Sequence, residues 1–264
     1  MNLKITNYGA IDNANINISK INVVGGVNNS GKTTAAKLMY CYLKSQLYNQ
    51  SLTSLVENEG LPDIKSAEFS GNLDISEIFF IEGISIIDLK DDGLFNLDHI
   101  RHVKKSLDIN GEYNPEVIQK IKDILKNDCS NLSSAGIKQI GLIQLLVENN
   151  SLKENSFLII DEPESNLHPA WQIKFAQILV FLAKEMNIYL YLNSHSPMFI
   201  EAISLYAQYY GLLDDTNFYL TQKQSNSMFS FKKINPKNMG EVYENLTRPY
   251  DELDKIKAQI LFRE

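Results

Sequence analysis

The sequence predicts an α/β fold built on a mostly parallel β-sheet, and three observations lead to this prediction. Short apolar runs of the kind that form strands covered on both faces recur along the chain. Segments with helical periodicity separate them, and strands that alternate with helices form parallel sheets. The first 20 residues instead alternate apolar and polar side chains, which is typical of an antiparallel hairpin. The apolar runs are residues 21–24, 78–81, 157–160 and 188–192.

Length and composition favour one globular domain over residues 1–264. Of the 264 residues, 44% are hydrophobic and 22% are charged, which is ordinary for globular proteins and excludes a mainly disordered chain. The formal net charge of −7 excludes an overall basic surface for nucleic acid. The sequence does not start with the basic segment and apolar run of a signal peptide, and no apolar stretch is long enough to span a membrane. We therefore expect a cytoplasmic protein with no membrane contact.

The N-terminal part is predicted to form a small β lobe followed by the first helix. Residues 1–20 form this lobe as a hairpin that turns at residues 7–9. After the apolar strand at residues 21–24, apolar spacing predicts a helix over residues 32–46. Residues 47–75 are polar and weakly periodic, so we expect a loop and a short helix there.

The middle of the chain is predicted to hold a small helical subdomain, over about residues 83–136. Within it, residues 96–127 carry apolar side chains at helical spacing, and another helix is expected over residues 137–147. The remaining predicted elements are a helix over residues 169–184, edge strands over 218–220 and 229–231, and a helix over 239–262.

A glycine-rich loop between the strand at residues 21–24 and the following helix predicts a phosphate site. Residues 26–33 match G-x-x-x-x-G-K-[ST] at every fixed position. Glycines let the backbone N–H groups turn toward phosphate oxygens, and the helix that begins there adds its positive end. Lys32 is expected to reach the β- and γ-phosphates of ATP as a catalytic residue, and Thr33 to bind Mg²⁺. The predicted nucleotide-binding residues of this loop are Gly26, Asn28, Asn29, Ser30, Gly31, Lys32, Thr33 and Thr34.

Carboxylates that follow the apolar strand at residues 157–160 supply the second half of this predicted site. Ligands sit beyond the carboxyl ends of parallel strands. Asp161 is expected to hold Mg²⁺, directly or through water, because Mg²⁺ combines few carboxylates with phosphate oxygens. Glu162 is the candidate general base that activates the attacking water. For Glu164 two roles stay open, a metal ligand or a cap of the turn after Pro163.

His195 follows the strand at residues 188–192 and is a further candidate catalytic residue. Of the four histidines, it alone stands at the end of a predicted core strand. There it is expected to hydrogen-bond the γ-phosphate and report its presence. The alternative is a histidine with a structural role only.

Together these motifs resemble the ATPase heads of the ABC type, and more narrowly the OLD-like, RecF-like and SMC-like ATPases. Two segments carry the resemblance, Asp-Glu-Pro-Glu-Ser-Asn-Leu-His-Pro at residues 161–169 and Asn-Ser-His-Ser-Pro-Met-Phe-Ile at residues 193–200. The resemblance implies a P-loop NTPase fold that hydrolyses ATP with Mg²⁺. It also implies a signature loop at residues 132–138, in which Ser134 and Gly136 complete the nucleotide site of a second copy.

Departures from the family pattern lie at two places. Ala135 and Ile137 stand where the signature loop usually has glycine and glutamine, and Ser134 has the alternative role of a plain helix cap. The coupling glutamine expected after the strand at residues 78–81 is absent, and Glu82 is the candidate in its place.

The resemblance implies partners as well as a reaction. Two heads would enclose two ATP molecules, as a homodimer or within a higher homo-oligomer. Such a head would regulate a separate effector, a nuclease or toxin, in DNA repair or anti-phage defence. DNA contact through Lys232, Lys233 and Lys237 stays open beside the alternative of a solvated face.

Two other functions also stay open. The altered signature loop is compatible with a nucleotide switch or scaffold that does not hydrolyse ATP. A transporter nucleotide-binding subunit is disfavoured by the missing coupling glutamine and by the segment at residues 167–169, Leu-His-Pro, where transporter heads usually have an aspartate.

Overall fold

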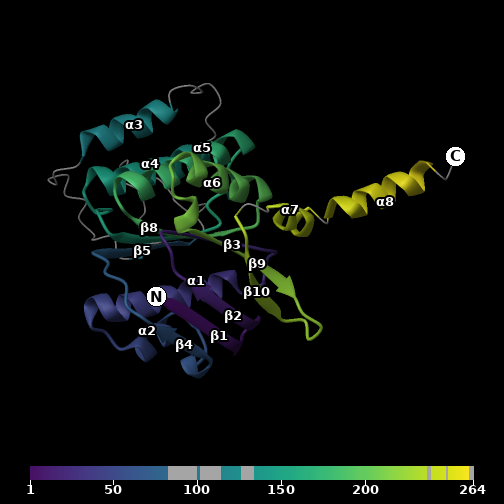
Figure 1. The fold of residues 1–264 in the computed structure, drawn as a ribbon, viewed down its shortest axis with the longest axis horizontal. Coiled ribbons are helices and arrows are strands. Elements are labelled where there is room, and N and C mark those ends of the chain that lie inside the picture. Colours follow the sequence, from purple (N-terminus) through teal and green to yellow (C-terminus); the bar gives the residue numbers. More distant parts are fainter. Residues whose placement is uncertain (83–99, 102–113, 126–133, 237–238, 248, 262–264) are drawn as a thin grey trace.

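The structure is a computed structural model that describes residues 1–82, 100–101, 114–125, 134–236, 239–247 and 249–261 (Figure 1). The strands are β1 (Asn2–Tyr8), β2 (Ile11–Asn17), β3 (Ile21–Gly25), β4 (Ala67–Ser70), β5 (Glu77–Glu82), β6 (Ile100–Arg101), β7 (Ser156–Asp161), β8 (Tyr189–Ser194), β9 (Thr216–Lys223) and β10 (Phe229–Ile234). The α-helices are α1 (Lys32–Tyr48), α2 (Leu52–Asn58), α3 (Pro115–Leu125), α4 (Ser134–Glu148), α5 (Pro169–Glu185), α6 (Pro197–Tyr209), α7 (Gly240–Leu246) and α8 (Pro249–Leu261).

Within the described residues, the strands form one sheet in the order β4-β1-β2-β10-β9-β3-β8-β7-β5-β6. Its centre is parallel, because β9, β3, β8, β7 and β5 run in one direction. Antiparallel pairs flank this centre: β6 pairs with β5, β10 with β9, and β1 with both β2 and β4. The predicted α/β fold with a mostly parallel sheet and an antiparallel N-terminal hairpin is confirmed.

The central strands are covered on both faces, which explains their continuous apolar sequences. Successive side chains of a strand point to opposite faces. In β7, Leu158 and Ile160 belong to one buried core, whereas Phe157 and Ile159 belong to the other. Helices α3, α4, α5 and α6 cover the first face (Figure 1). Helix α1 covers the second face and lies between the central strands and the N-terminal lobe.

The structure differs at residues 100–101 from the helix predicted over residues 96–127, whereas the helical subdomain itself stays a prediction. Residues 100–101, inside the segment predicted to be helical, form strand β6 and pair with Phe80 and Ile81 of β5. A helix is described only from Pro115 to Leu125 in that segment. The rest of residues 96–127 and part of the signature loop lie outside the described residues. The prediction failed at β6 because two residues are too few to show a period.

Other predicted elements also differ from the structure. Strands β9 and β10 are not edge strands: β9 lies between β3 and β10, and β10 lies between β9 and β2. The side chains of β9 alternate between the two cores, with Phe218 in one and Tyr219 in the other. The predicted C-terminal helix is divided in two, because Pro249 cannot continue a helix and instead begins α8. Strand β4 was missed because it has only four residues, two of them half-buried and two exposed.

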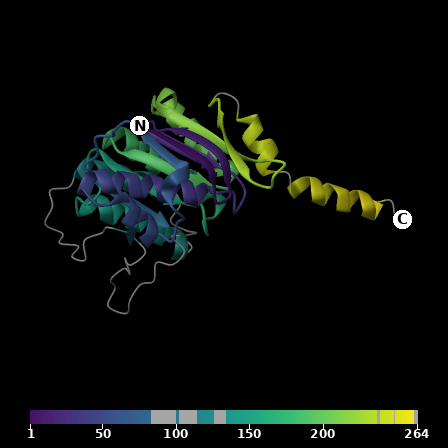
Figure 2. The ribbon, with the colours of Figure 1, turned by 90° about the horizontal axis from the view of Figure 1, so that it is seen from below.

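Helix α8 extends away from the rest of the fold in both views (Figures 1 and 2). Its residues from Leu253 onward are mostly exposed. Among the helices described, we find none that combines the length and apolar character required to span a membrane.

We expect Tyr191→Phe to stabilise the protein. Tyr191 of β8 is fully buried, and its hydroxyl has no hydrogen-bond partner among the described residues. Removing a buried, unpaired hydroxyl is expected to raise the free energy of unfolding by about 1 kcal/mol. For a chain of this size the melting temperature then rises by about 2–4 °C, which thermal unfolding measures.

Tyr219→Phe is the matched control. Tyr219 is also buried, but its hydroxyl donates to the Asn17 carbonyl (3.2 Å) and accepts from the Asn17 N–H (2.9 Å). Loss of these bonds is expected to lower the free energy of unfolding by about 1 kcal/mol. A lower melting temperature for both variants would contradict the assignment of the unpaired hydroxyl to Tyr191.

Candidate nucleotide site

The glycine-rich loop connects β3 to the start of α1, as the sequence predicts. Helix α1 begins at Lys32, and among the described residues no side chain caps its first amides, so they remain available to an anion. Two glycines are required by close packing. A Cβ on Gly26 would lie 1.8 Å from Thr221 Oγ1, and a Cβ on Gly31 would lie 2.4 Å from Ile11 Cγ1. The loop therefore keeps its shape because β9 and β2 press against it.

The loop lines a cavity of about 480 Å³, a volume typical of small-molecule sites. Glu162 reaches this cavity from the opposite side, at the end of β7. Ala10 also lines it, from the turn between β1 and β2, and sequence reasoning missed this residue because no local pattern links a hairpin turn to a distant loop. The lining residues are Ala10, Asn28, Asn29, Ser30, Gly31, Lys32, Thr33, Thr34 and Glu162.

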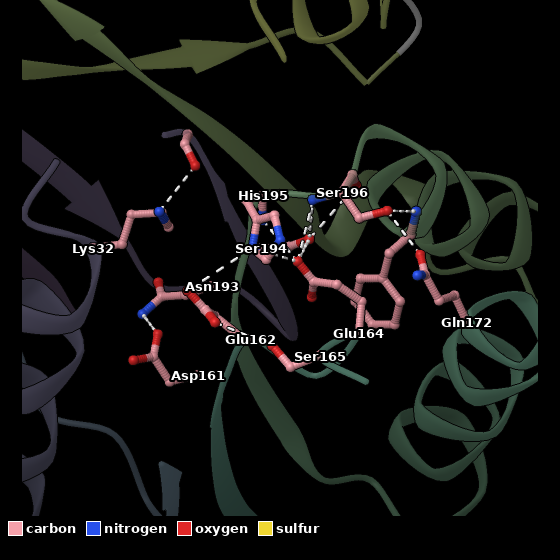
Figure 3. Close-up of polar contacts among 12 residues, drawn as sticks. Lys32, Asp161, Glu162, Glu164, Ser165, Gln172, Asn193, Ser194, His195 and Ser196 are labelled. Carbon is pink, nitrogen blue, oxygen red and sulfur yellow. Dashed lines mark hydrogen bonds and ion pairs between the residues drawn. The ribbon is translucent and has the colours of Figure 1, made fainter. Parts of the chain in front are cut away.

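Lys32 is almost buried, with 5% of its surface exposed. Its ammonium donates to the backbone carbonyls of Gly26 (2.9 Å) and Val27 (2.8 Å), so it lies over the loop (Figure 3). Burial lowers the pKa of this ammonium, while the negative charges of Asp161, Glu162 and nearby Glu164 oppose that shift. A positive charge is thus held against the backbone of the loop.

Asp161 is buried at the end of β7 and is held by two hydrogen bonds. Thr33 Oγ1 donates to its Oδ2 at 2.7 Å, and Asn193 Nδ2 donates to its Oδ1 at 2.8 Å. Burial raises the pKa of the Asp161 carboxyl, and these two hydrogen bonds oppose the shift. Hydroxyl and carboxylate oxygens are the ligands that Mg²⁺ prefers. Because Thr33 and Asp161 already lie together beside the loop, they fit the predicted ion.

Glu162 adopts a left-handed backbone conformation, with φ of 52°. Its N–H donates to the Asn193 carbonyl at 3.0 Å, and its Oε2 accepts from Ser165 Oγ at 3.0 Å. The side chain is partly exposed and faces the cavity. His195 comes from the end of β8 and lies next to it, with Nδ1 3.8 Å from Glu162 Oε1 (Figure 3). The structure therefore brings together the two residues predicted to act on water and on the γ-phosphate.

Glu164, whose two possible roles stay predictions, contacts the turn between β8 and α6. Its side chain is buried, and Oε1 accepts hydrogen bonds from Ser194 Oγ (2.7 Å), the His195 N–H (2.7 Å) and the Ser196 N–H (3.1 Å). Burial raises the pKa of this carboxyl, and the hydrogen bonds from the turn and the nearby His195 oppose the shift. The carboxylate therefore organises the turn between β8 and α6 (Figure 3).

Other predicted site residues lie away from this cavity or outside the described part of the chain. Ser134 and Gly136 fall in the first turn of α4, which contributes no residue to the described lining of the cavity. Glu82 ends β5 and forms an ion pair with Lys37 of α1 at 3.0 Å. Lys232 pairs with Glu241 of α7.

A comparison with protein families shows to which family the chain belongs. Residues 1–135, just over half of the chain, match the AAA ATPase domain family. The chain belongs to this family. In this AAA ATPase domain, the matched part includes the phosphate loop, whereas Asp161, Glu162 and His195 lie beyond it.

Solved structures similar to this AAA ATPase domain include two ATP-binding cassettes and an SMC head domain. The ADP conformation of MJ1267, an ATP-binding cassette of an ABC transporter, is 15% identical, with a TM-score of 0.48 over 92% of this chain and 98% of that one. MJ0796 bound to ADP and Pi is 14% identical, with a TM-score of 0.48 over 89% and 98%. The SMC head domain from Thermotoga maritima is 16% identical, with a TM-score of 0.47 over 88% and 98%. No curated protein matches the chain in sequence.

Asp161→Asn is expected to raise the melting temperature of the nucleotide-free protein at pH 7. Folding raises the pKa of this carboxyl, so its ionisation destabilises the fold above the folded-state pKa. Below the unfolded-state pKa of about 3.9 both states are protonated and the effect vanishes. The stabilisation should therefore shrink as the pH falls toward 4, which thermal unfolding over a pH series measures.

Asp63→Asn is the control for this substitution. Asp63 is exposed and pairs with Lys65 at 2.9 Å, so its removal should leave the melting temperature nearly unchanged at pH 7. An Asp161→Asn protein that melts below the wild type at pH 7 would show that ionised Asp161 stabilises the nucleotide-free fold.

Proposed function

We propose that this chain binds Mg·ATP at the phosphate loop and hydrolyses it to ADP and phosphate. One observation carries the proposal: Glu162 lines the same cavity as Lys32 and the loop, Asp161 accepts from Thr33 of the loop, and the His195 ring lies 3.8 Å from Glu162. Family membership supports the same activity. The described residues thus supply a group for each task of phosphoryl transfer.

Each residue has a distinct task in the proposed reaction. The loop amides and Lys32 bind the phosphates and stabilise the charge that develops on them. Thr33 and Asp161 would hold Mg²⁺, which neutralises phosphate charge when bound. Glu162 accepts a proton from water as the water oxygen bonds to the γ-phosphorus. The bond from that phosphorus to the bridging oxygen breaks, and ADP leaves with the electron pair.

The proposal includes a second copy of the chain and a separate effector. Two heads would enclose ATP between the phosphate loop of one and Ser134 and Gly136 of the other, as the resemblance implies. Regulation of a nuclease or toxin in DNA repair or anti-phage defence is proposed on that resemblance alone, as is contact with DNA. A helix start that carries a serine and a glycine is suited to donate to a γ-phosphate.

Glu162→Gln is expected to lower the rate of phosphate release by about 10²–10⁴-fold, because the amide cannot accept the proton. Nucleotide affinity should stay near that of the wild type, since Glu162 contacts water rather than the phosphates. Steady-state phosphate release and titration with a fluorescent ATP analogue measure the two quantities. Wild-type turnover in this variant would exclude Glu162 as the base.

Lys32→Ala is expected to lose ATP binding itself, because it removes the buried positive charge at the loop. Lys184→Ala, a substitution in the last turn of α5 far along the chain from the loop, is the matched control and should bind ATP normally. If Lys32→Ala bound ATP as tightly as the wild type, the cavity would not be the nucleotide site.

The solution mass of Glu162→Gln, measured by light scattering, tests the proposed second copy. Mg·ATP is expected to shift the mass from the 30.0 kDa of one chain to twice that value, since a slow variant keeps ATP between the heads. The double variant Lys32→Ala and Glu162→Gln should stay at one chain. A mass that does not respond to Mg·ATP in Glu162→Gln would contradict dimerisation around the nucleotide.

A further inference from the structure

Glu164 contacts His195 through a single carboxylate oxygen at two points. Its Oε1 lies 2.7 Å from the backbone nitrogen of His195 and 3.2 Å from the ring Nδ1. Only 3% of Glu164 is exposed, whereas the His195 ring is partly exposed beside the cavity. One buried oxygen of Glu164 therefore lies close to both the backbone and the ring of His195 (Figure 3).

The turn that carries His195 is fixed on its other side as well. Ser196 Oγ donates to Gln172 Oε1 of α5 at 2.8 Å and accepts from the Phe199 N–H at 3.2 Å, which caps α6. Gln172 Nε2 in turn donates to the Leu167 carbonyl at 3.2 Å. With its backbone held in this way, His195 keeps only the rotation of its ring as a freedom, and the contact with Glu164 limits that rotation.

We propose that Glu164 is a positioning residue that fixes both the orientation and the tautomer of His195. Donors from Ser194 and the turn amides converge on Oε1, so this oxygen acts as an acceptor and carries no proton. A carboxylate accepts but does not donate, so the ring nitrogen that faces it, Nδ1, carries the hydrogen. Nε2 is then the nitrogen left to contact the γ-phosphate or the attacking water, a step that rests on the proposed function.

The tautomer gives a test that does not depend on turnover. In nucleotide-free protein labelled with ¹⁵N-histidine, the His195 resonances, assigned by their loss in His195→Ala, should report a hydrogen on Nδ1. Glu164→Ala should remove this signature and free the ring, whereas Glu164→Gln should retain part of it because its amide oxygen still accepts. Glu148→Gln, on α4 and paired only with its neighbour Gln144 in the described contacts, is the matched control.

Kinetics give the second test. Glu164→Ala should lower kcat by about 10–100-fold, the range for partners that orient a functional histidine, with KM for ATP within about threefold of the wild type. Glu164→Gln should recover part of kcat. Because Glu164 acts through His195, the double variant Glu164→Ala and His195→Ala should be no slower than His195→Ala alone.

Several outcomes would overturn the proposal. A hydrogen on Nε2 in the wild type, or an unchanged ring signature in Glu164→Ala, would exclude a fixed tautomer. Additive losses in the double variant would show that Glu164 acts independently of His195. If Glu164→Ala does not fold, the His195 resonances of Glu164→Gln and of the wild type still show whether Glu164 fixes the tautomer. Absence of ATP hydrolysis in the wild type would remove the proposed function and leave the tautomer measurement to stand alone.

Discussion

The site depends on strand β8, which joins the two halves of the nucleotide cavity through its backbone. The Ser194 carbonyl accepts from the Gly26 N–H at 3.2 Å, and the Asn193 carbonyl accepts from the Glu162 N–H at 3.0 Å. These bonds continue the parallel ladder of β3, β8 and β7 beyond the ends of the strands. One hydrogen bond to β8 therefore fixes the start of the loop that carries Lys32. The other fixes Glu162, directly after Asp161.

The buried charges at this edge of the sheet lower the stability of the ligand-free fold. Lys32, Asp161 and Glu164 are all buried, and burial disfavours the charged form of each. Hydrogen bonds from Thr33, Asn193 and the β8–α6 turn offset part of this cost, and the opposite charges of the lysine and the carboxylates offset another part. These compensating contacts hold the buried charged groups in place in the ligand-free fold.

Motif residues could be predicted from the sequence because each motif is contiguous and its chemistry is local. The glycines, Lys32 and Thr33 occupy fixed spacings in one loop, and the apolar runs revealed the central strands. The pairing of Asn193 with Asp161 and of Glu164 with His195 was not predictable in the same way. Those contacts follow from the neighbourhood of β7 and β8, which about 30 residues and helix α5 separate in sequence. The sequence signal available for these contacts was a polar residue at the end of an apolar strand, such as Asn193.

The position of β9 and β10 in the sheet affects the order in which the protein is assembled during synthesis. Within the described sheet, β2 of the N-terminal lobe, which is made first, pairs with the late strand β10, and β3 pairs with β9. Thr221 of β9 also fills the space beside Gly26. A ribosome makes the phosphate loop before β9, so the loop lacks one of its walls until β9 has left the exit tunnel. For that interval the nascent chain carries the loop sequence while the binding shape of the loop is incomplete.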